Sequence, residues 1–526
     1  MFSSVTTGAI FGITSYLLQV ETDISRGLPS FSMVGFLSHE MKETGERVRV
    51  ALRNAGVELP PSKVVINFSP ADIPKRGVVF DLPVAVGILA AMDIVETNAM
   101  RGLLIAGELG LDGEVKPIRG ALPIVQRARE QGIRTCILPA SNAREGAVFE
   151  DMRIVPVRSL RQLIRYLLEP EEGRDRLIAP AERETFSAEG YREEPDEDLA
   201  DVCGQEASRR ALEIAAAGFH NVLMIGPPGS GKSMLARRMR GILPPLSARE
   251  SLEVSAIHSI AGRLPEGRTL ITRRPYYAPH HTITRAALTG GGTVPVPGVI
   301  TLANRGIVFM DELPEFGREN LDLLRQPLED YEITLTRSCG NFVYPARFLL
   351  LGAMNPCPCG FYPDRNRCRC TEREIRRYQA RVSGPVLDRI DLCTETQRVE
   401  FAELIRAGKQ EREGSRAVLQ RVMAARERQR ERFEGTELLF NSDMGPGRVG
   451  ELCPLGPSEE RLMARLFDML HLTARACHRM LRVARTIADL SGEEHIREEH
   501  LLEAAGFRMR VGPAAENAAQ QDGFSQ

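Results

Sequence analysis

Short apolar runs bounded by turn residues recur through the first 170 residues. Lys63–Phe68 alternates apolar and polar positions, as a half-buried strand does, and 103–106 and 135–138 are short apolar runs typical of buried strands. Residues 83–92 are almost entirely apolar and predict a buried helix. This mixture of strand and helix patterns predicts an α/β domain over residues 1–170.

Three further apolar runs predict buried strands in the middle of the chain, at 221–225, 307–310 and 349–354. The first is followed at once by a glycine-rich turn and then by a helical pattern over 234–239. Alternation of buried strands with helical segments favours a parallel sheet. We therefore place a second α/β unit at residues 201–395.

The remaining segments differ in composition. Residues 171–200 are rich in charge, broken by Pro and Gly and poor in β-branched residues, which predicts a linker. An arginine-rich helical segment and a further helical block predict a C-terminal helical domain at 396–510. The small and polar residues of 511–526 predict a disordered tail.

Length and charge narrow the class of protein. The 526 residues suggest about three domains. The net charge is -2, so any contact with nucleic acid must use local basic patches. No apolar run approaches the ~18–20 residues needed to span a bilayer, since the longest candidate, 82–95, contains Asp93. We expect a cytoplasmic protein without membrane contact, whose ten cysteines are thiols or metal ligands rather than disulfides.

The glycine-rich turn predicts an ATP pocket. It consists of Gly226, Pro227, Pro228, Gly229, Ser230, Gly231, Lys232 and Ser233. Strand, glycine loop and helix N-terminus together direct backbone N–H groups at an anion, and the flanking elements disfavour a chance glycine turn. Lys232 would reach the β- and γ-phosphates, and Ser233 would bind Mg²⁺.

Polar residues at the ends of the other two strands fit the same reaction. Asp311 and Glu312 follow the strand at 307–310. Asp311 would orient the Mg²⁺ shell, and Glu312 would polarise the attacking water. Asn355 follows the strand at 349–354, at the edge that faces ligands in an open α/β sheet, and would hold that water. Its alternative role is that of a turn-forming residue before Pro356.

Four stretches, read together, resemble the AAA+ ATPases, and among them the magnesium-chelatase-like ComM/YifB family. They are 201–238 around GPPGSGKS, 278–316 around IVFMDE, 353–360 (AMNPCPCG) and 383–392 (SGPVLDRIDL). The resemblance runs from residue 1 to about 508, with the motifs in order. It implies an AAA+ P-loop NTPase α/β core, a C-terminal helical lid and a ring assembly, expected as a hexamer.

The resemblance also implies roles for individual residues. Lys232 and Ser233 match Walker A, Asp311 and Glu312 match Walker B, Asn355 matches sensor 1, and Gln205 lies where the chain passes the adenine. Arg389 resembles the arginine finger that enters a neighbouring subunit's site; a guanidinium stabilises the charge that spreads over the γ-oxygens. A surface ion pair is its alternative. Arg475 resembles sensor 2, with Arg482 and Arg485 as nearby competitors.

The first domain resembles the proteolytic domain of Lon-type proteases, a ribosomal S5 domain 2-like fold. Residues 107–139 and 74–77 carry the likeness. Proteolysis there requires a Ser nucleophile and a Lys base, but 80–84 contains no serine and 121–124 no lysine. We therefore expect the fold without its protease chemistry. Binding of DNA, binding of a partner and help in ring assembly all stay open as its role.

Four cysteines in two close pairs, Cys357, Cys359, Cys368 and Cys370, predict a Zn²⁺ site. Their spacing is not the usual C-x2-C, so free thiols and disulfides stay open. His280 and His281 lack a nearby Cys or Asp that would complete a metal site. The cysteine segment is framed by Arg365, Arg367, Arg369, Arg373, Arg376, Arg377 and Arg381. These arginines either contact phosphates or form a solvated face.

Three functions follow from these patterns. The first is an ATP-driven ring motor on branched or single-stranded DNA; the family resemblance implies branch migration of recombination intermediates during uptake of foreign DNA. The second is the ATPase subunit of a complex that inserts magnesium into a porphyrin. The third is a nucleotide-switched scaffold with negligible turnover, which the intact Asp311–Glu312 pair disfavours.

Overall fold

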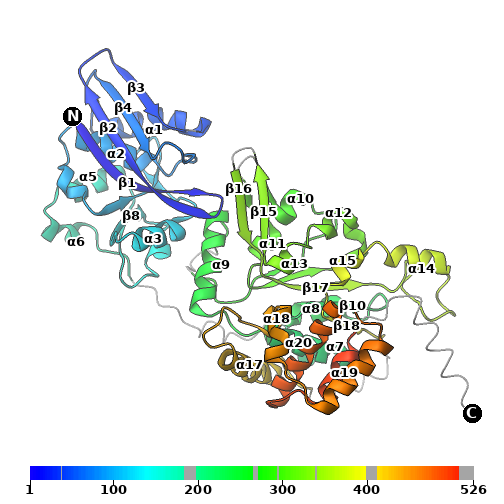
Figure 1. Cartoon of the computed structure of the whole chain (residues 1–526). Coiled ribbons are helices and arrows are strands. Elements are labelled where there is room, and N and C mark those ends of the chain that lie inside the picture. Colours follow the sequence, from blue (N-terminus) through cyan, green and yellow to red (C-terminus); the bar gives the residue numbers. More distant parts are fainter. Residues whose placement is uncertain are drawn as a thin grey trace, which may run out of the picture.

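The computed structural model describes residues 1–36, 38–182, 197–264, 270–292, 295–337, 340–398 and 412–508. The predicted tail at 511–526 and most of the predicted linker lie outside these residues. The described chain forms an N-terminal α/β domain, a second α/β domain and a C-terminal group of helices (Figure 1). In the described ranges, no helix has the length and apolar character needed to cross a membrane.

The first domain is built on a seven-stranded mixed sheet with the order β3-β4-β2-β1-β5-β8-β9. The strand predicted at 63–68 and the buried helix predicted at 83–92 are both confirmed. Strand β4 (Lys63–Ser69) buries every second residue, and helix α2 (Asp81–Ala91) is buried along its whole length. The strands are β1 (Phe2–Phe11), β2 (Thr14–Ser25), β3 (Ser30–Val34), β4 (Lys63–Ser69), β5 (Leu103–Ile105), β8 (Thr135–Pro139) and β9 (Arg153–Val157), beside the small pair β6 (Glu108–Leu109) and β7 (Val115–Lys116). The helices are α1 (His39–Asn54), α2 (Asp81–Ala91), α3 (Ala121–Glu130), α4 (Ala143–Gly146), α5 (Leu160–Leu168) and α6 (Arg174–Leu177).

The start of the predicted linker belongs to this first domain. Residues 174–177 form α6, and Ile178 is buried in the domain's core. Arg174 is buried, lies over the ring of Tyr166 and donates from Nε to the carbonyl of Glu169 at 3.0 Å. The charges that suggested a linker are thus partly used in packing, and the linker begins later than residue 171.

An ion pair occupies the place where a Lon-type nucleophile would be sought. Asp81 is fully buried at the start of α2 and accepts hydrogen bonds from Arg47, from Nε at 2.9 Å and from Nη2 at 3.0 Å. A carboxylate held in this way is a structural anchor for α1 and α2.

The second domain contains a five-stranded parallel sheet with the order β11-β14-β17-β10-β18. Its strands are β10 (Val222–Ile225), β11 (Tyr276–Tyr277), β14 (Ile307–Met310), β17 (Leu349–Met354) and β18 (Leu392–Glu395). Two hairpin pairs accompany it, β12 (Gly290–Gly291) with β13 (Val296–Pro297) and β15 (Glu332–Arg337) with β16 (Gly340–Pro345). The helices are α7 (Glu206–Gly218), α8 (Lys232–Ile242), α9 (Ala248–Ala261), α10 (Arg285–Thr289), α11 (Val299–Leu302), α12 (Gly317–Asp322), α13 (Pro327–Asp330), α14 (Glu372–Gln379) and α15 (Gly384–Leu387).

Parallel pairing brings the carboxyl ends of the three predicted strands to one edge. Ile225, the last residue of β10, pairs with Met354 of β17, and Met310 of β14 pairs with Gly352. The residues that follow these strands therefore converge, as expected for a ligand site in an open α/β sheet.

The C-terminal helices share a hydrophobic core with the second domain. They are α17 (Ser415–Arg432), α18 (Pro446–Leu452), α19 (Pro457–Met469), α20 (Ala474–Ser491) and α21 (Glu498–Gly506). Their apolar side chains pack against α7, α8 and the sheet in one continuous cluster. The predicted α/β fold class with a helical lid is confirmed.

The first domain rests on α9 and on the β15–β16 hairpin (Figure 1). The backbone N–H of Gly120 donates to the carbonyl of Ser259 at 3.1 Å, and the Ser259 hydroxyl donates to Glu145 at 2.6 Å. The rings of Phe11 and Phe342 lie 4.8 Å apart. The C-terminal helices lie at the bottom of the view, away from the first domain at the upper left (Figure 1).

Asp489 holds the lid together through a fully buried carboxylate. It accepts hydrogen bonds from Arg432 at 3.0 Å, from Arg485 at 3.2 Å and from Asn441 at 2.8 Å. We expect Asp489→Ala to lower the free energy of unfolding by about 3–5 kcal/mol, because buried guanidinium groups lose their counter-charge. Calorimetry measures this, with Asp468→Ala, an exposed carboxylate on α19, as the control. Equal melting of the two variants would contradict the assignment.

Candidate nucleotide site

The glycine loop joins β10 to α8, and its glycines are needed for two different reasons. Gly229 and Gly231 have φ of +74° and +90°, in the left-handed region that side chains disfavour. Gly226 faces a close neighbour, since a Cβ there would lie 2.1 Å from Oγ1 of Thr396. The predicted strand, loop and helix thus occur as a unit, with Lys232 as the first residue of α8.

The Lys232 ammonium lies inside the loop. Nζ donates to the carbonyls of Gly226 at 2.7 Å and Pro227 at 2.9 Å, and to Oδ1 of Asn355 at 3.3 Å. Burial lowers the pKa of Lys232, while the charge of Asp311 acts in the opposite direction. The sequence-predicted Lys232 and Asn355 are therefore in contact, across two neighbouring strands.

Ser233 and Asp311 form a pair of oxygen donors beside the loop. The Ser233 hydroxyl donates to Oδ2 of Asp311 at 2.6 Å. A hydroxyl and a carboxylate are the hard ligands that Mg²⁺ takes from a protein while keeping several waters, so these residues fit the expected ion. Two sequence-predicted metal ligands are thus adjacent, although they are 78 positions apart in the chain.

Glu312 turns out of the strand in a left-handed conformation. Its φ is +51°, and its backbone N–H donates to Oδ1 of Asp311 at 2.9 Å. The side chain is 59% exposed, so its carboxylate is accessible to water. This uncommon conformation turns the side chain away from the line of the strand.

His281 approaches the catalytic candidate Glu312 and was missed as a site residue. Its Nδ1 lies 3.8 Å from Oε2 of Glu312, and its ring lies 4.1 Å from that of His280. Glu312 lies 31 positions further along the chain, so the sequence around the histidines does not indicate this contact. Strand β11, just before the histidines, pairs with β14, just before Glu312, and no local pattern announces that pairing.

Gln205 and Thr396 both contact Ser230 of the glycine loop. Gln205 has φ of +61° at the start of α7, and its Nε2 donates to the carbonyl of Ser230 at 3.2 Å. The Thr396 hydroxyl lies 2.7 Å from that of Ser230. Gln205 therefore adjoins the loop, and Thr396 is a second residue that sequence reasoning missed.

Arg389 lies at the amino-terminal ends of the strands, opposite to the end that carries the glycine loop. Its carbonyl accepts a hydrogen bond from Nδ2 of Asn221 at 3.0 Å, and Asn221 immediately precedes β10. The glycine loop begins after β10, so the four residues of this strand, about 13 Å at 3.3 Å per residue, separate the two places. The guanidinium pairs with Glu329 and donates to the carbonyl of Pro385 at 2.6 Å.

Arg475 is exposed in the first turn of α20. One turn later, Arg479 donates to the carbonyl of Ile390 at 3.1 Å and lies 3.8 Å from Asp388. The structure therefore brings neither Arg389 nor Arg475 to the glycine loop of the same chain. Of the competing arginines, Arg485 is buried against Asp489 inside the lid.

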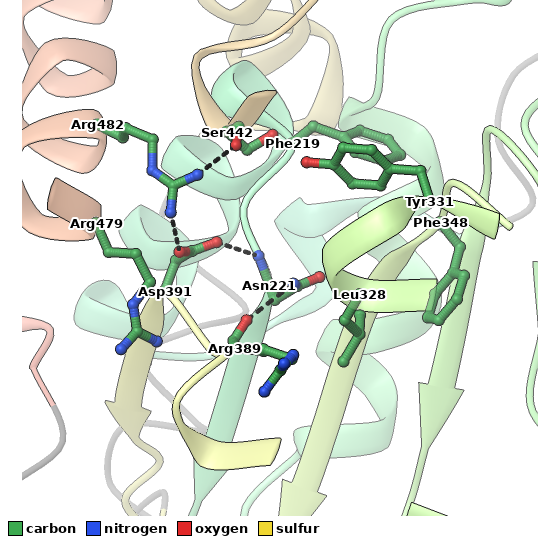
Figure 2. A pocket seen from close by; sticks show the side chains of 10 residues that line it. All are labelled: Phe219, Asn221, Leu328, Tyr331, Phe348, Arg389, Asp391, Ser442, Arg479 and Arg482. Carbon is green, nitrogen blue, oxygen red and sulfur yellow. Dashed lines mark hydrogen bonds and ion pairs between the residues drawn. The ribbon is translucent and has the colours of Figure 1, made fainter. Parts of the chain in front are cut away.

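Arg389 borders a pocket that Arg479 and Arg482 also line (Figure 2). The pocket is lined by Phe219, Asn221, Leu328, Tyr331, Phe348, Arg389, Asp391, Ser442, Arg479 and Arg482. Burial alone would raise the pKa of Asp391, but bonding to His220 and the charges of Arg482 and Arg479 lower it to about 2. Each of the three arginines has a carboxylate partner, namely Glu329 for Arg389, Asp388 for Arg479 and Asp391 for Arg482.

The four cysteines come together into one cluster. Their sulfurs all lie within 4.8 Å of one another, with Cys357 3.4 Å from Cys359 and 3.7 Å from Cys368. A tetrahedral metal with Zn–S bonds of about 2.3 Å places its sulfurs about 3.8 Å apart. A disulfide requires about 2.05 Å. The donor set therefore fits Zn²⁺ and disfavours the disulfide alternative.

The seven arginines that frame the cluster are all exposed. Arg365 lies over the ring of Tyr362 at 5.1 Å, and Arg367 lies over Phe361 at 4.3 Å. Stacking on aromatic rings limits the freedom of these guanidinium groups while leaving them in solvent. Arg376 and Arg381 also pair with Glu372 and Glu315, so the other arginines of this group are the more available to an anionic partner.

A parallel sheet with a glycine loop, an acidic pair and an asparagine at its carboxyl edge, together with a helical lid, defines an AAA+ P-loop protein. Comparison with known proteins agrees. The families described as "Magnesium chelatase, subunit ChlI", "Subunit ChlI of Mg-chelatase" and "Magnesium chelatase, subunit ChlI C-terminal" match residues 198–404, 20–142 and 412–508.

The chain belongs to the ComM/YifB family of magnesium-chelatase-like AAA+ proteins. It is 38% identical to the competence protein ComM of Haemophilus influenzae over 503 residues, 96% of each chain. It is 40% identical to YifB of Salmonella typhimurium, again over 96% of each chain. The magnesium-chelatase 38 kDa subunit of Cereibacter sphaeroides is 29% identical over 171 residues, which are 30% of this chain and 51% of that subunit. Family membership indicates an ATPase.

Proposed function

We propose that this protein is an ATP-hydrolysing ring motor that acts on DNA, as a branch-migration helicase in recombination. The observation that supports a ring assembly is that Arg389 lies at one end of β10 and the glycine loop at the other. An arginine placed there serves ATP only in a neighbouring copy. Repetition of such a head-to-tail contact closes into a ring, for which we propose six subunits in the cytoplasm.

Each residue of the glycine-loop edge has a role in this proposal. The loop N–H groups and Lys232 bind the phosphates of ATP, Gln205 borders the adenine, and Ser233 and Asp311 hold Mg²⁺, which neutralises developing charge on the phosphates when bound. Asn355 orients the attacking water. Glu312, whose side chain is exposed, accepts the proton from that water as it attacks the γ-phosphorus and displaces ADP.

Arg389 and Arg475 of one subunit complete the ATP site of its neighbour. Arg389 stabilises the charge on the γ-phosphate oxygens, and Arg475 contacts the same nucleotide from α20. Arg389 and the lid of one subunit then contact the same nucleotide, which is bound to the neighbouring subunit.

The proposed DNA partner rests on the relatives and on the basic surface. One relative similar over 96% of the chain is named a competence protein, and competence concerns uptake of DNA. The exposed arginines around the cysteine cluster supply phosphate contacts although the chain's net charge is -2. We propose that Zn²⁺ holds the four cysteines and gives this basic segment a fixed shape.

Magnesium insertion into a porphyrin is the second candidate, favoured by the family descriptions. The chelatase subunit, however, is similar to only 30% of the chain, whereas ComM and YifB are similar to 96%. The pattern of similarity therefore favours the DNA motor.

DNA should stimulate ATP turnover severalfold, most strongly with forked or four-way junctions, and the stimulation should weaken as salt rises because phosphate contacts release counterions. Steady-state ATPase assays with junction, single-stranded and blunt duplex DNA measure this, with Lys232→Ala as the inactive control. Turnover that no DNA changes would contradict the motor. Porphyrin metallation with partner subunits would instead establish the second candidate.

A further inference from the structure

The cysteine cluster lies directly against the ATP-binding loop. Gly360, between the two cysteine pairs, has φ of +82°, and a Cβ placed on it would lie 2.4 Å from Cδ and 2.8 Å from Cγ of Pro228. Its backbone N–H donates to the carbonyl of Cys357 at 3.0 Å. The backbone of the cluster and the glycine loop are thus in van der Waals contact, with no room for a side chain between them.

A second connection runs through Asn355. This residue touches Lys232 at 3.3 Å and stands two positions before Cys357. The carbonyl of Pro356, between them, accepts a hydrogen bond from Nε2 of Gln379 at 3.0 Å, at the end of α14. The segment that leaves the ATP site is therefore fixed on one side by the cluster and on the other by the helix that follows it.

The cluster has little apolar packing of its own. Its local core contains three buried side chains, Cys357, Cys368 and Ile375, with Phe361 and Tyr362 partly buried around them. So small a core does not order a loop by itself, and small units of this kind depend on a metal for their stability. Where a metal orders its ligands, its binding free energy is folding free energy.

We infer that the metal held by the four cysteines fixes the shape of the ATP pocket, so that zinc occupancy and ATP affinity are coupled. The metal orders 357–370, this segment supports Pro228 through Gly360, and it holds Asn355 against Lys232. Loss of the metal releases both supports and weakens ATP binding. Because coupling between two sites is reciprocal, bound ATP must in turn retain the metal. The inference rests on the proposed ATP and zinc sites.

Three variants of the full chain test this coupling. Cys357→Ser with Cys359→Ser removes two ligands, Gly360→Ala inserts a methyl group against Pro228 while keeping all four, and Cys477→Ser is a matched control outside the cluster. Zinc content is measured by mass spectrometry, the ATP Kd by titration calorimetry with a non-hydrolysable analogue, and the fold by circular dichroism.

The wild type and Cys477→Ser should carry one zinc per chain and bind the analogue alike. The double Ser variant should lose zinc, and its Kd should rise by about 5–150-fold, the usual range of coupling between sites. Gly360→Ala should keep zinc and still bind the analogue more weakly. An unchanged Kd in a folded, zinc-free double variant would overturn the coupling.

A reciprocal measurement on the wild type needs no variant to fold. Release of zinc to a coloured chelator is followed with and without the analogue, which should slow it. Equal release at saturating analogue would overturn the coupling. Absence of zinc from the wild type would instead refute the zinc assignment, and failure to bind the analogue would refute the proposed ATP site, so the three failures are distinguishable.

Discussion

Glu312→Gln should bind ATP as the wild type does and hydrolyse it about 10²–10⁴-fold more slowly, the range lost with a general base. The amide has the shape of the carboxylate but cannot take the proton of the attacking water. Glu312 is turned toward solvent by a left-handed backbone and is not needed for packing. Binding of labelled ATP and single-turnover hydrolysis separate the two steps.

The matched control is Glu315→Gln, the same change three residues further along, at an exposed carboxylate that pairs with Arg381. It should leave the chemical step nearly unchanged. If Glu312→Gln hydrolysed ATP within a few-fold of the wild type, another residue would have to be the base. His281, 3.8 Å away, would then be the next to examine.

Arg389→Ala should lower kcat by about 10³-fold or more, as removal of an arginine finger does, without weakening ATP binding to its own chain. The reason is position, since Arg389 and the glycine loop lie at opposite ends of β10. Arg389→Lys should recover little, because the ammonium lacks the planar fork of donors. Measurement of kcat and of ATP Kd tests both expectations.

Arg325→Ala is the control for this change, as an exposed arginine in the same region, four residues before Glu329. It should have wild-type turnover. Loss of ATP binding in Arg389→Ala with kcat retained would contradict a role in trans. It would indicate instead that the ion pair with Glu329 is structural.

The parts of the site that sequence could predict are local ones. The strand–loop–helix unit at 221–239 carries its own signals, because apolar run, glycines and helix adjoin in the chain. Asp311 and Asn355 could be placed since each ends a buried strand, and parallel strands end at one edge. The cysteine site could be predicted because its four cysteines form two close pairs, although their spacing is atypical.

The parts that sequence could not predict depend on which elements become neighbours. The sheet order β11-β14-β17-β10-β18 does not follow the chain, so the approach of His281 to Glu312 had no local signal. The contact of Gly360 with Pro228 likewise joins two loops more than a hundred residues apart. The charge of residues 174–178 predicts a linker, whereas the packing that places them in the first domain has no signal in the sequence.

The central claim is that adjoining subunits share each ATP. Mixing Arg389→Ala with Lys232→Ala chains tests it most directly, because each variant alone is inactive for a different reason. Where an Arg389→Ala subunit offers its intact loop to a neighbour with an intact finger, a complete site forms. A random 1:1 ring contains about a quarter such sites, so turnover should return to about that fraction of wild type if mixed rings assemble. Turnover no higher than the sum of the two variants, in rings shown by cross-linking to contain both, would contradict the claim.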